Sequence, residues 1–331
     1  MTRNDPPPRD AEWSGVDPEA LLTRAARARL GPVLDAQTTV ARLCNGEGDG
    51  LPGLMVDAAG PVALVQAYQE RWRPRLPRLA QALAAAGWPS SRLTVRGQGG
   101  VAAGEEAFLG PPLEPERAES ESGLGYLIRA ADESLSVGRV PDARGARGLL
   151  RTLSRGQRVL NLFAYAGGFT VAALAGGAGQ VDQVDASRKA AGWSARNVAI
   201  NGFSPRGCRF VVDDAPAFCA RAARRGERYG VVVLDPPTFG RSRQGRFSTA
   251  ADGALLADAL ALVEDGGRLL FGLNTTDQAV GQLWTRVVTA AGGHAEPVLE
   301  TTLGPGLDFP APPGLPHLER FKMLVIRVHA G

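Results

Sequence analysis

The chain has 331 residues, a formal net charge of +3 and a pI near 9.0. This length suffices for a catalytic domain of about 180 residues and a smaller domain, and the 44% of apolar residues can fill a sizeable core. Glycine and proline are abundant but form no repeat, which excludes a fibre or a wholly disordered chain. The small positive charge alone does not establish a nucleic-acid partner.

The cysteines and histidines are few, and none of them has the spacing of a metal site. They therefore predict reduced cytosolic thiols and no bound metal. No apolar run reaches the roughly 18 residues of a membrane span, and the first residues lack a signal-type apolar stretch. We expect a cytoplasmic protein without a membrane segment, and the oligomeric state stays open.

The first 130 residues predict a short tail followed by a small α+β domain, which is a candidate for RNA binding. Residues 1–17 have the composition of a disordered tail. Hydrophobic spacing then predicts helices over 18–30 and 74–86, and strands over 39–43, 54–57, 62–68, 92–96 and 125–129. The acidic, proline-bearing stretch 105–121 is typical of a loop, and residues 131–148 are expected to connect to a second domain.

Residues 149–331 alternate strand-like runs with helix-length segments. The expected strands are 159–163, 180–185, 209–213, 230–235, 268–273, 295–300 and 321–328, and the expected helices are 169–175, 187–201, 216–225, 250–263 and 277–291. This alternation predicts the α/β class, with a doubly wound, seven-stranded, Rossmann-like sheet and helices on both faces. Because no helix separates the last two strands, we expect an antiparallel pair at one edge.

Polar and small residues follow the first three predicted strands, at the sheet end where such folds bind ligands. The first strand turns into a helix through Asn161–Thr170, where small residues permit close approach of a ligand to the backbone. A carboxylate at the second strand end can accept both hydroxyls of a ribose, and one at the third can accept from an adenine amino group. The residues expected to hold the cofactor here are Phe163, Tyr165, Gly167, Asp185, Ser187, Asp213 and Asp214.

Each of these signals has an ordinary structural reading. A Gly-Gly turn alone is more often only a tight turn, and a strand-end aspartate is as often merely solvated. The first two signals would also suit a nicotinamide cofactor, but the glycine spacing is not G-x-G-x-x-G. Together with Asp235-Pro-Pro-Thr-Phe at the end of the fourth predicted strand, these signals predict S-adenosylmethionine as the cofactor.

The fourth predicted strand ends in Asp235-Pro-Pro-Thr-Phe. Its two prolines, Pro236 and Pro237, stiffen the turn, while Asp235 and the Pro236 carbonyl present hydrogen-bond acceptors. Phe239 offers a flat face on which an extruded base could stack. Asp235 is therefore expected to contact both cofactor and substrate. The alternative is a proline turn that only caps a core strand. Three arginines follow and suit RNA phosphates, although each is as well explained by a solvated surface: Arg241, Arg243 and Arg246.

A family resemblance covers roughly residues 40–275. It lies in Asn45–Asp57 (NGEGDGLPGLMVD), Pro141–Arg147 (PDARGAR), Asn161–Thr170 (NLFAYAGGFT), Val184–Ser187 (VDAS), Asn197–Gly202 (NVAING), Asp213–Asp214 and Leu234–Phe239 (LDPPTF). Together these segments resemble the class I S-adenosylmethionine-dependent large-subunit ribosomal RNA methyltransferases that modify cytosine C5 or guanine N7. The first looks like the opening of their small middle domain. The resemblance implies that Asp142, Arg144 and Arg147 border the cofactor pocket.

The chain departs from the cytosine-modifying members in two ways. Those members usually begin with an RNA-binding module of the PUA type, for which the residues before Thr39 are too few. They also carry a catalytic cysteine after the fifth strand, where this chain has Asn274 in the sequence FGLNTT. Cytosine C5 needs a thiolate to add to the ring first, whereas a base nitrogen already has an electron pair for the methyl group. Asn274 resembles the asparagine of the guanine-N7 members and could bond a base edge.

The sequence therefore predicts an enzyme that methylates a base nitrogen of ribosomal RNA, with guanine favoured. Its expected partner is ribosomal RNA or an assembling large subunit. One alternative is a methyltransferase for a protein or a small molecule, and another is a catalytically idle RNA-binding or assembly factor. The fold alone does not choose among them. The target nucleotide and the base atom stay open.

Overall fold

The computed structural model describes residues 17–96, 102–130, 141–237, 239–242, 245–248, 253–275, 278–312 and 320–331. Of residues 239–242 and 245–248 it describes the backbone alone. The described chain forms two compact units, Met1–Leu113 with Pro310–Gly314, and Glu114–Phe309 with Leu315–Gly331. Each unit is described by itself. Within the described ranges, no helix is long and apolar enough to cross a membrane.

The first unit contains a five-stranded sheet in the order β1-β2-β3-β4-β5, in which β3 and β4 alone are parallel. Its elements are α1 (Pro18–Arg27), β1 (Val40–Asn45), β2 (Leu54–Ala59), β3 (Val62–Ala67), α2 (Leu76–Ala86), β4 (Ser90–Arg96) and β5 (Ala102–Leu109), with short 3₁₀ turns η2 (Gly46–Asp49) and η3 (Glu70–Arg75). α1 begins where the Asp17 carboxylate accepts the backbone N–H of Glu19. The core of this unit buries Leu22 of α1, Trp72 of η3 and Leu79 of α2. The helices α1 and α2 therefore cover the sheet with their apolar faces.

The stretch 105–121 is not a loop, so that prediction was wrong. Its beginning lies in β5, and its end forms β6 (Arg117–Glu121), which pairs antiparallel with β7 (Leu124–Ile128). The hairpin β6–β7 belongs to the second unit, which begins at Glu114. The predicted boundary near residue 130 therefore differs from the observed division. The acidic composition concealed the strand because its buried Glu119 and Glu121 are paired with arginines.

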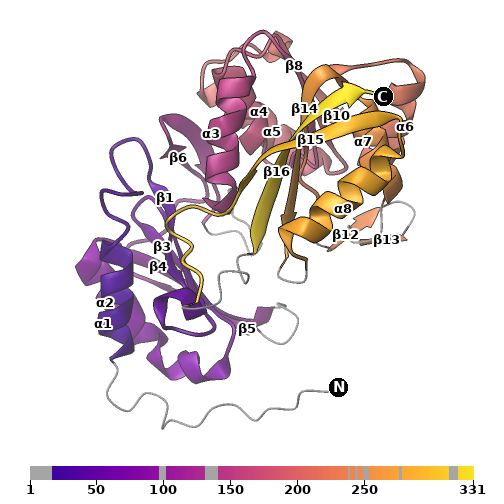
Figure 1. Ribbon diagram of the computed structural model, residues 1–331. Helices are drawn as coiled ribbons and strands as arrows, with labels where there is room; N and C mark the ends of the chain where they lie inside the picture. The colour runs from indigo at the N-terminus through magenta and orange to yellow at the C-terminus, as the bar shows by residue number, and fades with distance from the viewer. Residues whose placement is uncertain are drawn as a thin grey trace. The chain divides into compact units, whose positions relative to one another are not determined.

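The second unit is built on a seven-stranded sheet in the order β10-β9-β8-β11-β14-β16-β15 (Figure 1). The strands are β8 (Arg158–Leu162), β9 (Gln180–Asp185), β10 (Cys208–Val212), β11 (Tyr229–Leu234), β14 (Val263–Asn274), β15 (Ala295–Leu303) and β16 (Phe321–Ala330). The first five are parallel, and β16 pairs antiparallel with both β14 and β15. The predicted α/β sheet with an antiparallel edge is thus confirmed.

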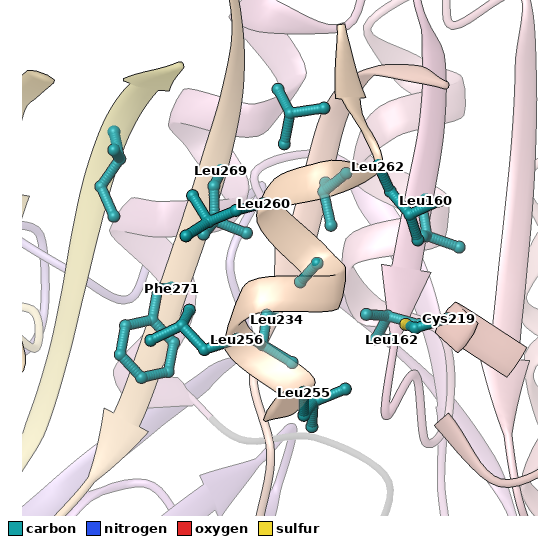
Figure 2. Close-up of a cluster of buried hydrophobic side chains, with 14 of the residues drawn as sticks. Leu160, Leu162, Cys219, Leu234, Leu255, Leu256, Leu260, Leu262, Leu269 and Phe271 are labelled. Atoms are coloured by element: carbon teal, nitrogen blue, oxygen red, sulfur yellow. The ribbon is translucent and has the colours of Figure 1, made fainter. Parts of the chain in front are cut away.

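Helices cover both faces of this sheet. They are α3 (Arg144–Leu153), α4 (Gly168–Ala175), α5 (Arg188–Ile200), α6 (Ala215–Arg224), α7 (Gly253–Ala261) and α8 (Val280–Ala291), with 3₁₀ turns η5 (Pro141–Ala143) and η6 (Pro205–Gly207). Val231 and Val233 of β11 pack with α3 and α4, whereas Val232 and Leu234 pack with α6, α7 and α8. Figure 2 shows the core between the sheet and the second set of helices, with Leu256 of α7 among residues of β8, β11 and β14. This alternation is what makes the sheet doubly wound.

The hairpin β6–β7 is held to α5 by a set of side-chain bonds. Asn201 exchanges two hydrogen bonds of 2.8 Å with the backbone of Gly125, and Asn197 accepts the N–H of Leu127 at 2.8 Å. The Trp193 indole donates to the Leu127 carbonyl at 3.0 Å. Asn197 also donates to the Ala166 carbonyl at 2.8 Å, which joins the hairpin to the turn after β8. Residues 141–148 are not a free connection, because η5 and α3 pack on the sheet.

Candidate functional site

The chain order places a reversal between β8 and β11, because β10 lies at the edge of the sheet and β11 returns beside β8. Ligands of such sheets bind at this point, outside the carboxyl ends of the strands. The turn after β8 is strained there: Phe163 and Tyr165 have φ values of +55° and +46°, a conformation that non-glycine residues rarely adopt. Gly167 has φ +78°, and a Cβ on it would lie 1.8 Å from the Ser194 hydroxyl oxygen of α5. The glycine therefore lets α4 and α5 approach.

Asp185, at the end of β9, holds this turn. One of its carboxylate oxygens accepts the N–H of Tyr165 and the other that of Ser187, both at 2.8 Å. Each oxygen keeps a lone pair for a further donor. Ser187 is the N-cap of α5, where its hydroxyl accepts the N–H of Ala190. Ser187 therefore stabilises the start of α5, whether or not it also contacts a ligand.

The two aspartates after β10 have different surroundings. Asp213 accepts the N–H of Asp214 and forms an ion pair with Arg221 of α6. Asp214 is the N-cap residue of α6, but its side chain caps no backbone N–H of the helix. The Asp214 oxygens are therefore not used by the helix end. The Asp214 carboxylate is thus available to a ligand at the carboxyl end of β10.

Asp235 follows β11 and lies against β14. A Cβ on Gly272 of β14 would be 2.6 Å from the Oδ1 atom of Asp235, so this glycine makes room for the carboxylate. Asp235 as a whole residue is half-buried, and Pro236 is buried while Pro237 is exposed. Burial and, to a smaller extent, the negative charge of Asp142 raise the pKa of Asp235 to about 7, and the positive charge of Arg147 opposes both. Asp235 can therefore exchange a proton near neutral pH.

Asp142 and Asn274 come together although 132 positions separate them in the chain. The Asn274 amide donates to Oδ2 of Asp142 at 2.6 Å. Asp142 is 6% exposed and lies in η5, at the start of α3. The structure thus joins a residue expected at the cofactor to one expected at the base. The Asp142 carboxylate therefore sets the orientation of the Asn274 amide.

Arg144 and Arg147 lie in buried ion pairs. Arg147 donates two hydrogen bonds of 2.9 Å to Glu121 of β6, and these side chains are 5% and 4% exposed. Arg144 donates to Asp308, which is fully buried, at 2.9 Å. Burial alone would lower the pKa of the Arg147 guanidinium, but Glu121, together with Tyr126 and Asp142, raises it above its usual value. These arginines connect the hairpin β6–β7 to the strand tips.

Part of the predicted substrate side is described only as backbone. Phe239, Arg241 and Arg246 lie in a two-stranded hairpin of β12 (Phe239–Ser242) and β13 (Gly245–Ser248), in which Arg241 and Arg246 are paired positions. Arg243 lies outside the described residues. The structure therefore gives the proline turn and the hairpin that follows it, without the aromatic side chain expected to stack on a base.

Sequence reasoning missed four residues that support the site: Glu121, Trp193, Asn197 and Asp308. Glu121 was assigned to a loop, and Asp308 carried no recognisable motif. Asn197 belonged to a segment of the family resemblance, which was a signal without an assigned role. Trp193 packs edge-to-face on Tyr165, with ring centroids 5.7 Å apart.

Across the described ranges, no group of three or more His, Cys, Asp or Glu side chains could hold a metal ion.

Comparison with known proteins identifies the family. A family model described as S-adenosylmethionine-dependent methyltransferase matches residues 62–304, which is most of the chain. The protein belongs to this methyltransferase family. The strand-tip aspartates and the strained turn after β8 lie within the residues that this family model matches.

Individual relatives agree with this membership. The chain is 34% identical over 248 residues to the ribosomal RNA large subunit methyltransferase I of Cronobacter sakazakii, covering 71% of this chain and 62% of the relative. It is 31% identical over 271 residues to the ribosomal RNA large subunit methyltransferase of Deinococcus radiodurans, covering 79% and 65%. The chain thus spans slightly less than two thirds of the length of these relatives.

Solved structures confirm the fold of this methyltransferase. SMU.776, which was solved in complex with SAH, superposes with a TM-score of 0.85 at 22% identity, over 93% of this chain and 80% of that chain. The S-adenosylmethionine-dependent methyltransferase of Agrobacterium tumefaciens gives 0.62 at 21% identity, over 89% and 91%. At such low identity the likeness establishes the architecture alone.

Proposed function

We propose that this protein transfers the methyl group of S-adenosylmethionine to a base nitrogen of ribosomal RNA, with guanine as the favoured base. The observation that carries the proposal is Asp235 in a rigid diproline turn, beside the strand tips that would hold the cofactor. The names of the two bacterial relatives support the RNA substrate. The partner would be ribosomal RNA or an assembling large subunit, and the location cytoplasmic.

The residues around the turn after β8 fit S-adenosylmethionine. Asp185 retains lone pairs for the ribose hydroxyls, and Asp214 offers an uncommitted carboxylate for the adenine amino group. The turn Phe163–Gly167 lets a ligand approach the backbone beside the N-terminus of α4. When bound, the cofactor supplies an electrophilic methyl group on a positively charged sulfur. Tyr165 and Ser187 complete this pocket in our proposal.

The acceptor would be held by Asp235 and the Pro236 carbonyl, with Phe239 stacked on the base. An exocyclic amine would use its lone pair to form the N–C bond while the C–S electrons stay on sulfur, and its surplus proton would pass to Asp235. A ring nitrogen such as guanine N7 would lose no proton, and the carboxylate would then stabilise the positive charge that develops on the base. Arg241, Arg243 and Arg246 would contact phosphates.

Cysteine catalysis does not fit the described structure. All three cysteines are buried, and burial raises the pKa of each thiol to about 12. Cys208 opens β10, Cys219 lies in α6, and Cys44 belongs to the other unit. None of them follows β11 or β14, where a thiolate would have to meet the base. These positions favour methylation of nitrogen over cytosine carbon.

We expect the triple replacement Cys44→Ala, Cys208→Ala and Cys219→Ala to retain methyl transfer. Each thiol fills a small space in a different one of three hydrophobic clusters, so the variant should lose stability rather than chemistry. Steady-state kinetics at a temperature where the variant is folded would check this. A fall in kcat of about a hundredfold or more at unchanged fold would point to a covalent thiolate step.

The direct test is methyl transfer from radiolabelled S-adenosylmethionine. The acceptors are ribosomal RNA from cells that lack the gene, intact large subunits from the same cells, ribosomal proteins, and free nucleotides. We expect label in ribosomal RNA, and nuclease mapping of the labelled nucleoside then identifies the base atom. The matched control is Asp235→Asn, which keeps the size of the side chain and removes its charge.

The two alternatives give other outcomes. Label in protein or in free nucleotides alone would replace the RNA substrate by a protein or a small molecule. Binding of S-adenosylmethionine in calorimetry, without label in any acceptor, would favour a catalytically idle assembly factor. Absence of cofactor binding would overturn the cofactor assignment itself.

A further inference from the structure

Asp142 and Asp235 form an acidic pair at the strand tips of the second unit. Asp142 is buried, and its charge acts on Asp235 strongly enough to help raise the pKa of that carboxyl. Asp142 lies in η5 and Asp235 follows β11, and both carboxylates lie against the end of β14, Asp142 at Asn274 and Asp235 at Gly272. Two like charges in a partly desolvated place cost free energy unless a proton or a nearby cation compensates them. Their proximity therefore calls for a functional explanation.

Both carboxylates are neighbours of β14. Asn274, the last residue of β14, donates to Oδ2 of Asp142 at 2.6 Å. Gly272, two residues earlier, leaves the space that the Asp235 carboxylate occupies. Behind them, Arg147 of α3 is locked by two bonds to Glu121 of β6. Asp142 is thus bonded to the end of β14, and Asp235 lies beside the same strand two residues earlier.

The charged groups around Asp235 can be named element by element. η5 contributes Asp142, and α3 contributes Arg147, whose charge is already shared with Glu121 of β6. β14 contributes no ionisable group beside it, only Gly272 and Asn274. From β16, Lys322 directs its ammonium group to the Thr275 carbonyl at 2.8 Å. Asp142 is thus the acidic member of this set that acts on Asp235.

We propose that Asp142 is a positioning residue, which orients the Asn274 amide beside the acceptor and controls, through its charge, whether Asp235 carries a proton. This inference rests on the proposed function, because Asp235 is taken as the group that touches the base. With Asp142 charged, Asp235 exchanges its proton near neutral pH. It is then able to accept an amine proton and to return it to solvent.

Two replacements separate the two duties of Asp142. Asp142→Asn removes the charge but keeps an oxygen that can accept from the Asn274 amide. Asp142→Ala removes both the charge and the acceptor. For each variant, kcat is measured against pH at saturating cofactor and RNA, together with thermal unfolding. The control is Asp308→Asn, which removes another fully buried charge, paired with Arg144 and not among the groups that act on Asp235.

The wild-type rate should rise with pH around a midpoint near 7, because Asp235 accepts only when ionised. In Asp142→Asn the midpoint should move to lower pH, which raises the fraction of maximal rate at pH 6 by about fivefold for a one-unit shift. Asp142→Ala should show the same shift and also a lower maximal kcat. Asp308→Asn should keep the wild-type midpoint, although its stability falls.

A second measurement does not depend on turnover. Carboxyl-¹³C NMR titration of aspartate-labelled protein, with the Asp235 signal assigned through Asp235→Asn, reports its proton directly. A lower titration midpoint in Asp142→Asn supports the proposal even if no RNA is methylated, in which case the proposed function alone has failed. An Asp235 midpoint that is the same in wild type and Asp142→Asn overturns the role of Asp142, whatever the activity.

Discussion

Replacing Asp235 by alanine is expected to lower kcat for methyl transfer by about 10²- to 10⁴-fold, the usual worth of a positioned proton acceptor. The effect is large because Asp235 lies at the start of the proline turn after β11, with its carboxylate in the space left by Gly272 at the strand tips. Radiolabel transfer at saturating S-adenosylmethionine measures the change. Binding of the cofactor, followed by calorimetry, should weaken far less than the rate.

The isosteric variant Asp235→Asn shows what kind of contact the carboxylate makes. It keeps an oxygen that can accept a hydrogen bond but cannot take up a proton. An exocyclic amine substrate should suffer nearly as much from asparagine as from alanine, whereas a guanine N7 substrate should retain more activity. If Asp235→Ala transfers methyl groups at the wild-type rate, the acceptor site has been assigned to the wrong turn.

The second large effect concerns the buried pair Glu121 and Arg147. Glu121→Ala is expected to lower the free energy of unfolding by about 3–5 kcal/mol, because the Arg147 charge stays buried without its bidentate partner. Thermal or urea unfolding of the full chain measures this loss. The matched control is Glu116→Ala, whose pairs with Arg129 and Arg196 are more exposed and are worth about 1 kcal/mol or less each.

The double variant Glu121→Leu with Arg147→Met tests whether the cost comes from an uncompensated charge. It should recover much of the stability lost by Glu121→Ala, since two apolar side chains fill the same space. It should not recover activity, because Arg147 also opposes the charges of Asp142 and Asp235. Equal stability of Glu121→Ala and Glu116→Ala would mean that solvent reaches Arg147 and that the pair is not buried in solution.

The fold could be predicted largely because its signals are local. Runs of β-branched residues and leucine in β8, β11 and β16 mark strands without knowledge of their neighbours. The antiparallel edge followed from the lack of a helix between β15 and β16. The hairpin β6–β7 escaped prediction, because Glu121 is acceptable in a strand only through Arg147, which lies 26 residues later.

The candidate site was predictable in its positions but not in its partnerships. The sequence predicts three site aspartates because each follows a strand of a parallel sheet: Asp185, Asp214 and Asp235. In the structure the carboxyl ends of these strands lie at the same end of the sheet. The bond between Asp142 and Asn274 joins positions 132 residues apart, and no spacing rule reports it. Similarly, the family resemblance implies that Arg144 and Arg147 border the cofactor pocket, but it does not indicate their ion pairs with Asp308 and Glu121.

β16 has a consequence for how the molecule is made. It is the last strand in chain order, yet it lies inside the sheet, bonded to β14 on one side and to β15 on the other. During translation, β14 and β15 therefore leave the ribosome with no mutual pairing, and each exposes an open edge until β16 arrives. Nascent chains halted before Phe321 would carry a complete set of strand-tip aspartates on an unfinished sheet. Chaperone protection should matter most in that interval.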